Sequence, residues 1–491
     1  MQIKGNRVLA LTLLLFTIAA VANSHAQTLS VLYNFGTRAF DPAGPGWIGS
    51  IAQGRDGNLY STTEGGGTTN NGTVFRLTPD GKLNVMYNFC SQPSCADGTT
   101  PEGGLTLGYD GNFYGTTTNG GTNNGSIGTL FRITPSKVYT VLHVFGSISN
   151  DGDFPISAPT QGVGDTMYGA TPHGGGSCGV IYAITLHGAY SVLYSFSGIS
   201  PDGCNPEASP IVAADGNLYG TANIGGTSNN GVVYRLTPSG KETTIYSFDG
   251  IHGSEPWGPL VEGSDGNFYG TTLKGGTSNA GVIFEVTPTG TETVLHNFNG
   301  TTDGGFVYAG LVQATDGNFY GVAQQGGNTS SLCQGGPPSG TCGTLFQVTP
   351  TGAFSVIYDF DGTHGFSSLV APFQHTNGLI YGDTSLGGTG KNCLGDRGMD
   401  LCGVFYQLDA NLPGYVALSP YRGNVGRQVE FLGQGFTSAT TVSFNGVLAT
   451  PIIVSGTHLV THVPSGATTG FVTVTTSSGT LTSNKQFIVT P

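Results

Sequence analysis

Short runs of alternating apolar and polar residues recur along most of the chain, separated by turns rich in Gly, Asn and Asp. Such alternation is typical of strands that are buried on one face. Three kinds of run each occur seven times, with successive copies 50 to 62 residues apart. They are typified by VLYNF at 31–35, GTVFRLTP at 72–79 and DGNFYGTT at 110–117. The pattern predicts an all-β repeat protein.

Each repeat contains four predicted strands. In the fifth repeat, the dipeptide Asp265-Gly266 lies between two of them. Asp-Gly between apolar runs is a strong signal for a two-residue hairpin, because that turn requires positive φ angles. The four strands of this repeat are expected at 258–264, 267–272, 281–288 and 291–298. Four antiparallel strands that recur radially predict the blade of a β-propeller.

The two ends of the repeat region complement each other. The first VLYNF-type run, at 29–35, stands alone before the first full repeat, and the seventh repeat stops near Leu408 after three strands. The N-terminal strand would therefore complete the seventh blade and close a ring. An open solenoid is the alternative, but it gives no reason for this complementarity. We expect a seven-bladed β-propeller over residues 29–411.

Composition agrees with this class of fold. The 491 residues include 83 Gly and 25 Pro, and only 9% are charged, which argues against a mainly helical chain or a coiled coil. The 27 Phe and 21 Tyr can build a core, so the chain does not have a disordered composition. The net charge of −13 argues against a nucleic-acid partner, whose phosphates need a basic surface.

Residues 1–26 have the features of a secretory signal peptide. Lys4 and Arg7 precede an apolar run at 8–22, and the small residues Ser24 and Ala26 occupy the two positions that a signal peptidase reads before the expected cleavage near Ala26 and Gln27. The run is shorter than the roughly 20 residues that span a bilayer. After signal removal we expect no transmembrane segment, and a protein that is secreted or located at the cell surface or in the periplasm.

The repeats resemble the bacterial GloVer tandem repeats over residues 29–411. This resemblance implies an exported protein of the choice-of-anchor kind, and it implies no established biochemical activity. Residues 415–491 are similar to the IPT/TIG domain, whose GxGF, VxFNG and VPxGAxTG patterns occur at 433–436, 442–446 and 463–470. The second resemblance implies an immunoglobulin-like β-sandwich that serves as a spacer or an adhesive module.

All eight cysteines fall in loops at one face of the expected propeller. An even number of cysteines in an exported chain indicates disulfides. Three pairs share a loop, and the fourth pair is brought together by the blade geometry. The expected disulfides are Cys90–Cys95, Cys178–Cys204, Cys333–Cys342 and Cys393–Cys402.

The same face carries the candidate ligand site. The tight Asp-Gly turns lie at the opposite face, whereas long Gly-Gly and inter-blade loops gather here, and loops on a rigid scaffold usually carry binding. Counted back from the hairpin aspartate, four residues share one register position at the start of the innermost strand, and a fifth is one residue out of register. An aromatic ring with carboxylates around a channel would suit a sugar; the alternative is that the rings only fill the channel. The candidates are Trp47, Glu102, Glu207, Trp257 and Tyr308.

Catalytic signatures are weak. The GxSxG match at 175–179 lies in a loop of an all-β blade and lacks the strand–turn–helix context of a nucleophile elbow. We therefore expect no catalytic residues, no metal and no cofactor. Glu102 and Glu207 could act on a glycosidic bond only if they lay roughly 5 to 9.5 Å apart.

These observations favour an exported, non-catalytic binding or surface-interaction protein, with polysaccharide or another surface protein as its partner. Carbohydrate binding through the long-loop face is the specific hypothesis. The alternatives are a hydrolase or lyase that acts on polysaccharide, and a purely structural envelope protein. The fold itself does not decide between them, because propellers host many functions.

Overall fold

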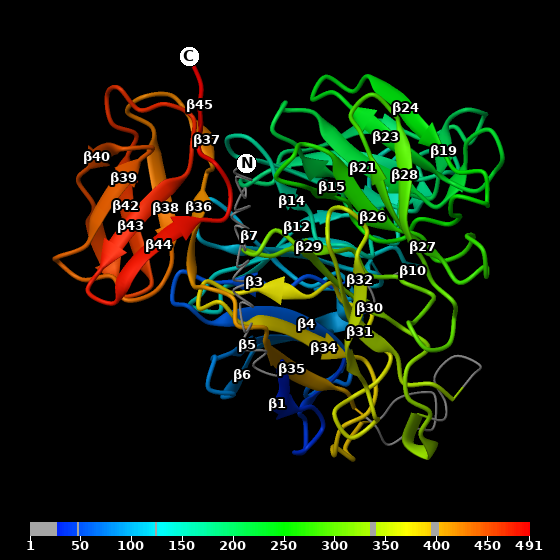
Figure 1. Cartoon of the computed structure of the whole chain (residues 1–491). Helices are drawn as coiled ribbons and strands as arrows, with labels where there is room; N and C mark the ends of the chain where they lie inside the picture. The colour runs from blue at the N-terminus through cyan, green and yellow to red at the C-terminus, as the bar shows by residue number, and fades with distance from the viewer. Residues whose placement is uncertain (1–26, 47–48, 123–124, 334–339, 394–401) are drawn as a thin grey trace, which may run out of the picture.

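The computed structural model describes residues 27–46, 49–122, 125–333, 340–393 and 402–491. They form seven four-stranded antiparallel blades and a separate β-sandwich (Figure 1). The described part of the chain contains two short 3-10 turns, η1 (Pro93–Cys95) and η2 (Ser331–Cys333), and no α-helix. The expected all-β propeller followed by an immunoglobulin-like sandwich is confirmed.

In each blade the first strand lines the central channel, and the next three follow outward. The first strands are only two residues long: β3 (Ala52–Gln53), β7 (Thr106–Leu107), β14 (Thr160–Gln161), β20 (Ile211–Val212), β25 (Val261–Glu262), β29 (Val312–Gln313) and β33 (Phe373–Gln374). The second strands are β4 (Leu59–Gly66), β8 (Phe113–Thr117), β15 (Thr166–Thr171), β21 (Leu218–Ala222), β26 (Phe268–Thr271), β30 (Phe319–Ala323) and β34 (Ile380–Thr384). The third are β5 (Thr73–Leu77), β11 (Thr129–Ile133), β17 (Val180–Thr185), β23 (Val232–Leu236), β27 (Val282–Val286), β31 (Thr344–Val348) and β35 (Val404–Asp409).

The outer strands come last in blades one to six: β6 (Leu83–Asn88), β12 (Tyr139–Val144), β18 (Tyr190–Ser195), β24 (Glu242–Ser247), β28 (Glu292–Asn297) and β32 (Phe354–Asp359). The seventh outer strand is β1 (Thr28–Asn34) from the N-terminus, which pairs antiparallel with β35 from Thr28↔Asp409 to Asn34↔Val404. Figure 1 shows β1 in blue beside β35 in orange. The ring is therefore closed by the N-terminal strand, as the sequence predicts.

The hairpin aspartates stabilise the turns between first and second strands. Asp215 accepts the backbone N–H of Asn217 at 2.9 Å and the hydroxyl of Tyr219 at 2.9 Å. The same Asp–Tyr bond, 2.7 to 3.0 Å long, recurs in five blades. The aspartates thus fix the hairpins, in agreement with the turn interpretation of the Asp-Gly dipeptides.

Three of the seven third strands carry a different tyrosine, whose hydroxyl is unpaired. Tyr182, Tyr234 and Tyr406 are fully buried, and none of their phenol oxygens has a hydrogen-bond partner within the protein. In blade four the oxygen packs onto Gly220, where any Cβ would overlap it. Four blades have Phe at this position: Phe75, Phe131, Phe284 and Phe346.

We expect Tyr234→Phe to stabilise the protein, because it removes a buried hydroxyl that makes no bond, by about 1 kcal/mol. Tyr219→Phe is the matched control in the same blade, since it deletes the bond to Asp215, and we expect it to lose about 1–2 kcal/mol. Urea unfolding followed by circular dichroism measures both. Equal midpoints for the two variants would contradict the assignment.

Small ribbons at the long-loop face add to the predicted strands. Inter-blade segments pair with the Gly-Gly loop of the next blade, so the long loops are not free. The ribbons are β13 (Gly152–Asp153) with β16 (His173–Gly174) and β19 (Gly203–Cys204) with β22 (Ile224–Gly225), while β2 (Pro42–Pro45) extends β4 and β9 (Gly121–Thr122) pairs with β10 (Gly125–Ser126).

The C-terminal sandwich has two sheets that share strand β36. Tyr415 and Val416 pair in parallel with β44, and Ala417–Ser419 pair antiparallel with β38. Phe431 and Phe444 are central in its core. The strands are β36 (Tyr415–Ser419), β37 (Arg422–Gly423), β38 (Gln428–Leu432), β39 (Thr441–Phe444), β40 (Val447–Ala449), β41 (Ile452–Ser455), β42 (His458–His462), β43 (Val472–Thr476), β44 (Gly479–Ser483) and β45 (Ile488–Val489).

The sandwich docks onto the hairpin face of the propeller (Figure 1). Arg55 of blade one forms an ion pair with Glu430 at 2.7 Å. On the far side of the ring, the Tyr421 hydroxyl donates to the carbonyl of Val212 in blade four at 3.2 Å. Blades one and four lie on opposite sides of a sevenfold ring, so the sandwich crosses the channel axis. Further bonds join Thr457 to Arg55, Tyr415 to Gln374 and Gln434 to Thr376.

Candidate functional site

The candidate residues lie at the start of the first strands, at the end of the channel away from the sandwich. Glu102, Glu207, Trp257 and Tyr308 come from blades two, four, five and six. At the same register, blades three and seven supply the buried side chains of Ile156 and Leu369. Trp47 lies outside the described residues. We call this ring the channel mouth.

The two glutamates of the channel mouth belong to blades two and four, and Glu207 is the more deeply buried one. Glu207 is only 6% exposed, and its Oε1 accepts a 2.7 Å hydrogen bond from Nδ2 of Asn223. Burial, and secondarily the charge of Glu102, raise the pKa of Glu207 to about 8. Glu207 is therefore mostly protonated at neutral pH.

The two aromatic residues of the channel mouth come from blades five and six, which follow the blade of Glu207. Trp257 and Tyr308 pack edge to face, with ring centroids 5.3 Å apart at 75°. The indole Nε1 of Trp257 and Oδ1 of Asn223 are buried without a hydrogen-bond partner within the protein. Such unpaired buried atoms are rare in proteins and call for an explanation.

A charged pair lies beside Tyr308. Lys274 Nζ contacts Glu255 Oε1 at 3.1 Å. Burial raises the pKa of Tyr308, while the charge of Lys274 lowers it and that of Glu255 raises it. The nearby cation is therefore already matched by a carboxylate.

A cavity of about 180 Å³ lies on the axis just inside the channel mouth. Its wall combines apolar residues, among them Ile51 and Phe373, with the hydroxyl groups of Ser50, Ser157 and Ser209, and the last two serines share a 2.8 Å hydrogen bond. Small residues are required here because neighbouring first strands touch. A Cβ on Gly103, for example, would lie 2.6 Å from the backbone nitrogen of Ala158.

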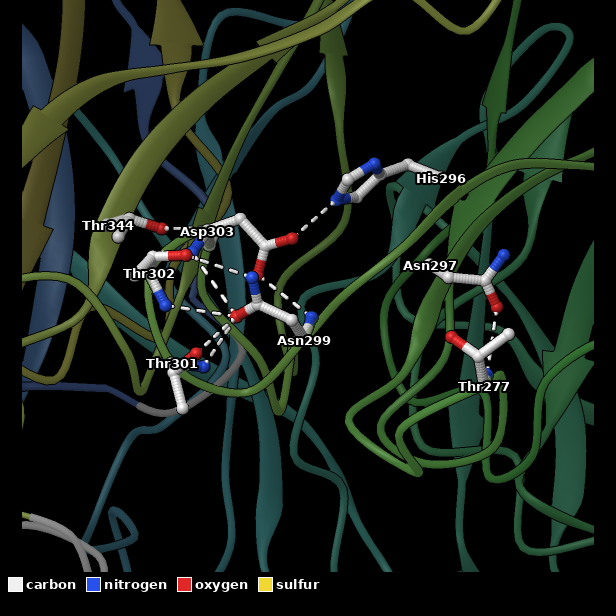
Figure 2. A network of polar contacts seen from close by, with 8 residues as sticks. All are labelled: Thr277, His296, Asn297, Asn299, Thr301, Thr302, Asp303 and Thr344. Carbon is white, nitrogen blue, oxygen red and sulfur yellow. Dashed lines mark hydrogen bonds and ion pairs between the residues drawn. The ribbon is translucent and has the colours of Figure 1, made fainter.

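The inter-blade aspartates are structural caps. Asp303 accepts Nε2 of His296 at 3.1 Å and the backbone N–H of Asn299 at 2.9 Å (Figure 2). Asn299 in turn accepts the backbone N–H groups of Thr301 and Thr302. Asp97, Asp151 and Asp202 make the same kind of bond to Tyr or His of the preceding outer strand. These carboxylates accept hydrogen bonds from groups of their own loops and of the preceding outer strands.

Histidines in the outer strands contact the next blade. His143 stacks on Tyr190 at 3.6 Å between centroids, and His296 stacks on Phe354 at 3.7 Å. Tyr87 of blade one stacks on Tyr139 of blade two in the same way. These side chains therefore pack blade against blade.

Four disulfides tie the long-loop face, and they join the cysteines in the pairs expected from the blade geometry. Their Cα atoms lie 4.0 to 5.5 Å apart, and no described cysteine is free. The bonds are Cys90–Cys95, Cys178–Cys204, Cys333–Cys342 and Cys393–Cys402.

Within the described ranges, no group of three or more His, Cys, Asp or Glu side chains is placed to hold a metal ion. A search of the same residues finds no helix with the length and apolar character needed to cross a membrane.

Sequence reasoning missed three polar residues at the channel mouth: Asn223, Glu255 and Lys274. Asn223 directly follows its second strand, and at the corresponding position the other blades have Glu64, Thr118, Pro172, Leu273, Gln324 and Ser385. Because this position varies so widely and includes a second amide, the sequence gives no signal that singles out Asn223. Nothing in the repeat pattern indicates that it bonds to Glu207.

The comparisons with known proteins agree with this architecture. The family described as the Gloeobacter/Verrucomicrobia repeat matches residues 16–178 and 174–396. The chain belongs to this repeat family. An IPT/TIG domain matches residues 415–489 of the repeat protein. No curated protein matches the chain.

Solved structures similar to the repeat protein share little sequence with it. A 6-phosphogluconolactonase candidate from Bacteroides uniformis is 15% identical, with a TM-score of 0.43, over 66% of this chain and 88% of that one. A gluconolactonase from Xanthomonas campestris is 10% identical, with a TM-score of 0.35, over 60% and 85%. A luciferin-regenerating enzyme is 13% identical, with a TM-score of 0.37, over 62% and 89%. At these identities no activity is transferred to the repeat protein.

Proposed function

We propose that the repeat protein is exported and binds carbohydrate, without catalysis, at the channel mouth of its long-loop face. The observation that carries this proposal is the edge-to-face pair of Trp257 and Tyr308 at the channel mouth, together with the unpaired indole nitrogen of Trp257. Aromatic rings stack on the apolar faces of sugars, and a few fixed polar groups orient the hydroxyls. Disulfides and the exported character of the repeat family support a location outside the cytoplasm.

A glycan array probed with residues 27–491 tests the proposal. We expect selective binding by the wild-type chain and at least a tenfold loss of affinity in Trp257→Ala, because losing an aromatic anchor at a binding site costs about 2 kcal/mol or more. His143→Ala is the control, since it removes an aromatic ring that is committed to an inter-blade contact. If the wild-type chain is folded and no glycan binds, the carbohydrate proposal is wrong.

One observation favours glycoside hydrolysis as a second candidate. Burial, and secondarily the charge of Glu102, raise the pKa of Glu207 to about 8, which favours the protonated form that a general acid needs. Release of reducing ends from a bound glycan, abolished in Glu207→Gln while binding persists, would favour catalysis over binding alone.

A further inference from the structure

We propose that the cavity on the channel axis binds one neutral sugar ring, the terminal unit of a glycan whose remaining units lie at the channel mouth. This inference rests on the carbohydrate site proposed above, and it names the part of the glycan that is recognised and its charge. It follows from four features of the cavity: its place in the channel, its volume, its lack of charge and the two unlike sides of its wall.

The cavity lies one level deeper in the channel than the channel mouth. Its wall residues follow those of the channel mouth along the chain, as Gly103 directly follows Glu102 and Ala309 directly follows Tyr308. The sandwich crosses the axis at the opposite face, through contacts with blades one and four. A ligand therefore reaches the cavity from the channel mouth.

The volume of the cavity fits a single six-membered ring. Its 180 Å³ slightly exceeds the volume of about 150 Å³ in which an apolar protein cavity holds benzene. It is smaller than the roughly 300–1,000 Å³ of pockets that enclose larger ligands. One sugar unit fills the cavity, and the next unit of a chain has to lie at the channel mouth.

The lack of charge selects a neutral ligand. None of the described residues that line the cavity is acidic, basic or a histidine. A charged group would lose its hydration in the cavity without gaining a counter-charge, which costs far more than burying a hydroxyl that finds a hydrogen bond. Uronic acids, amino sugars and sugar phosphates are therefore excluded from the cavity.

One side of the wall is rich in hydroxyl groups. Blades two, three and four supply Thr106, Ser157, Thr160 and Ser209. Ser157 and Ser209 are 5% and 6% exposed, and their hydroxyl oxygens lie 2.8 Å apart. Two hydroxyls have two protons and the bond between them uses one, so the pair can also donate to and accept from the hydroxyls of a sugar.

The other side of the wall is apolar. Blades five, six and seven supply only proline, alanine, glycine, leucine and phenylalanine to the described wall, and Phe373 is its one aromatic ring. Blade one, between the two sides, supplies Ser50 and Ile51. A sugar ring has the same two kinds of surface, since its hydroxyls surround apolar faces that pack on aromatic rings.

Isothermal titration calorimetry of residues 27–491 with D-glucose, D-galactose, D-mannose and N-acetylglucosamine tests the inference. We expect at least one of these four sugars to bind with a Kd of about 1 mM or lower. Its uronic acid and its 6-phosphate should bind at least about tenfold more weakly. The neutral sugar that binds should also displace the glycans that the chain binds on an array, because both need the cavity.

Thr160→Phe fills the cavity with a side chain that the fold already holds at the same register. Thr160 pairs with Tyr168 in blade three as Phe373 pairs with Tyr381 in blade seven. We expect Thr160→Phe to weaken binding of the neutral sugar at least about tenfold. Thr160→Ser is the matched control, since it keeps the hydroxyl and adds no volume, and its affinity should stay within about twofold of the wild type.

A double variant gives the test if Thr160→Phe does not fold. Replacing Ser157 and Ser209 together by alanine removes the buried hydroxyl pair and leaves the rest of the wall in place. We expect the same loss of at least about tenfold in affinity for the neutral sugar, because its hydroxyls would lose their buried partners.

The outcomes separate the inference from the function on which it rests. Glycan binding that depends on Trp257, persists in the cavity variants and is not displaced by any of the four sugars would overturn the cavity site and leave the channel mouth in place. No binding of any arrayed glycan or of any of the four sugars would overturn both. A uronic acid that binds as tightly as its neutral sugar would overturn the assignment of a neutral ligand.

Discussion

Deletion of residues 28–35, which removes β1 and Phe35, is expected to prevent the propeller from reaching its native state. β1 is the outer strand of blade seven, and without it β35 has an unpaired edge. Its side chains also complete two neighbouring cores: Leu29 and Val31 pack with blades six and seven, and Phe35 packs with blades seven and one. We expect loss of the cooperative unfolding transition in urea, followed by circular dichroism.

Phe35→Ala is the graded form of the same experiment. The ring of Phe35 is 0% exposed and packs edge to face on Phe75 of blade one, with centroids 5.6 Å apart. We expect the free energy of unfolding to fall by about 3–5 kcal/mol. Phe40→Ala is the matched control: its ring is 69% exposed, so the change should stay within about 0.5 kcal/mol. A deletion variant that unfolds at the wild-type urea concentration would show that β1 is dispensable.

The ring and its closure could be predicted from sequence because the fold repeats. A pattern that recurs in seven copies is visible even where single copies depart from it. The last repeat has three strands and a lone strand is expected at 29–35, so every strand has a partner only if these two segments pair. The repeat register also gives Glu102, Glu207, Trp257 and Tyr308 the same position in their blades, and in the structure Trp257 packs against Tyr308. Ligand binding by these residues stays a prediction.

Other features depend on distances between blades, which a repeat pattern does not encode. The first strands are only two residues long, and the residues just before them contact the next blade, since a Cβ on Gly103 would lie 2.6 Å from the backbone nitrogen of Ala158. The repeat pattern gives no distance across the channel, so it does not predict that the charge of Glu102 contributes to the raised pKa of Glu207. The sandwich contacts the propeller through individual side chains, such as the ion pair of Arg55 with Glu430, and these residues are not part of the repeat pattern.

A buried carboxyl in blade seven is another exception to the repeat. Asp383 is 1% exposed, and neither carboxyl oxygen has a hydrogen-bond partner within the protein. At the same position four blades have a threonine whose hydroxyl donates to a backbone carbonyl of the next blade, at 2.8 to 3.3 Å. These are Thr62, Thr116, Thr221 and Thr271.

Asp383→Thr is therefore expected to stabilise the protein by at least about 2 kcal/mol at pH 7, because it replaces an unpaired buried carboxyl with the side chain that four other blades use. Burial raises the pKa of Asp383 well above its ordinary value of about 3.9. The folded protein thus keeps a proton that the unfolded chain releases above about pH 4, so the aspartate destabilises the fold increasingly as the pH rises.

The gain from Asp383→Thr should consequently grow with pH from about pH 4 to the folded-state pKa of Asp383, by about 1.4 kcal/mol per pH unit, and be smallest below pH 4, where both states are protonated. Asp383→Asn separates the two causes, since it removes the titration and keeps a buried polar group. It should reproduce the pH dependence of the gain with a smaller gain at every pH. Urea midpoints at pH 4, 6 and 8 measure this, and a gain that is the same at all three would mean that Asp383 is ionised in the folded protein as readily as in the unfolded chain.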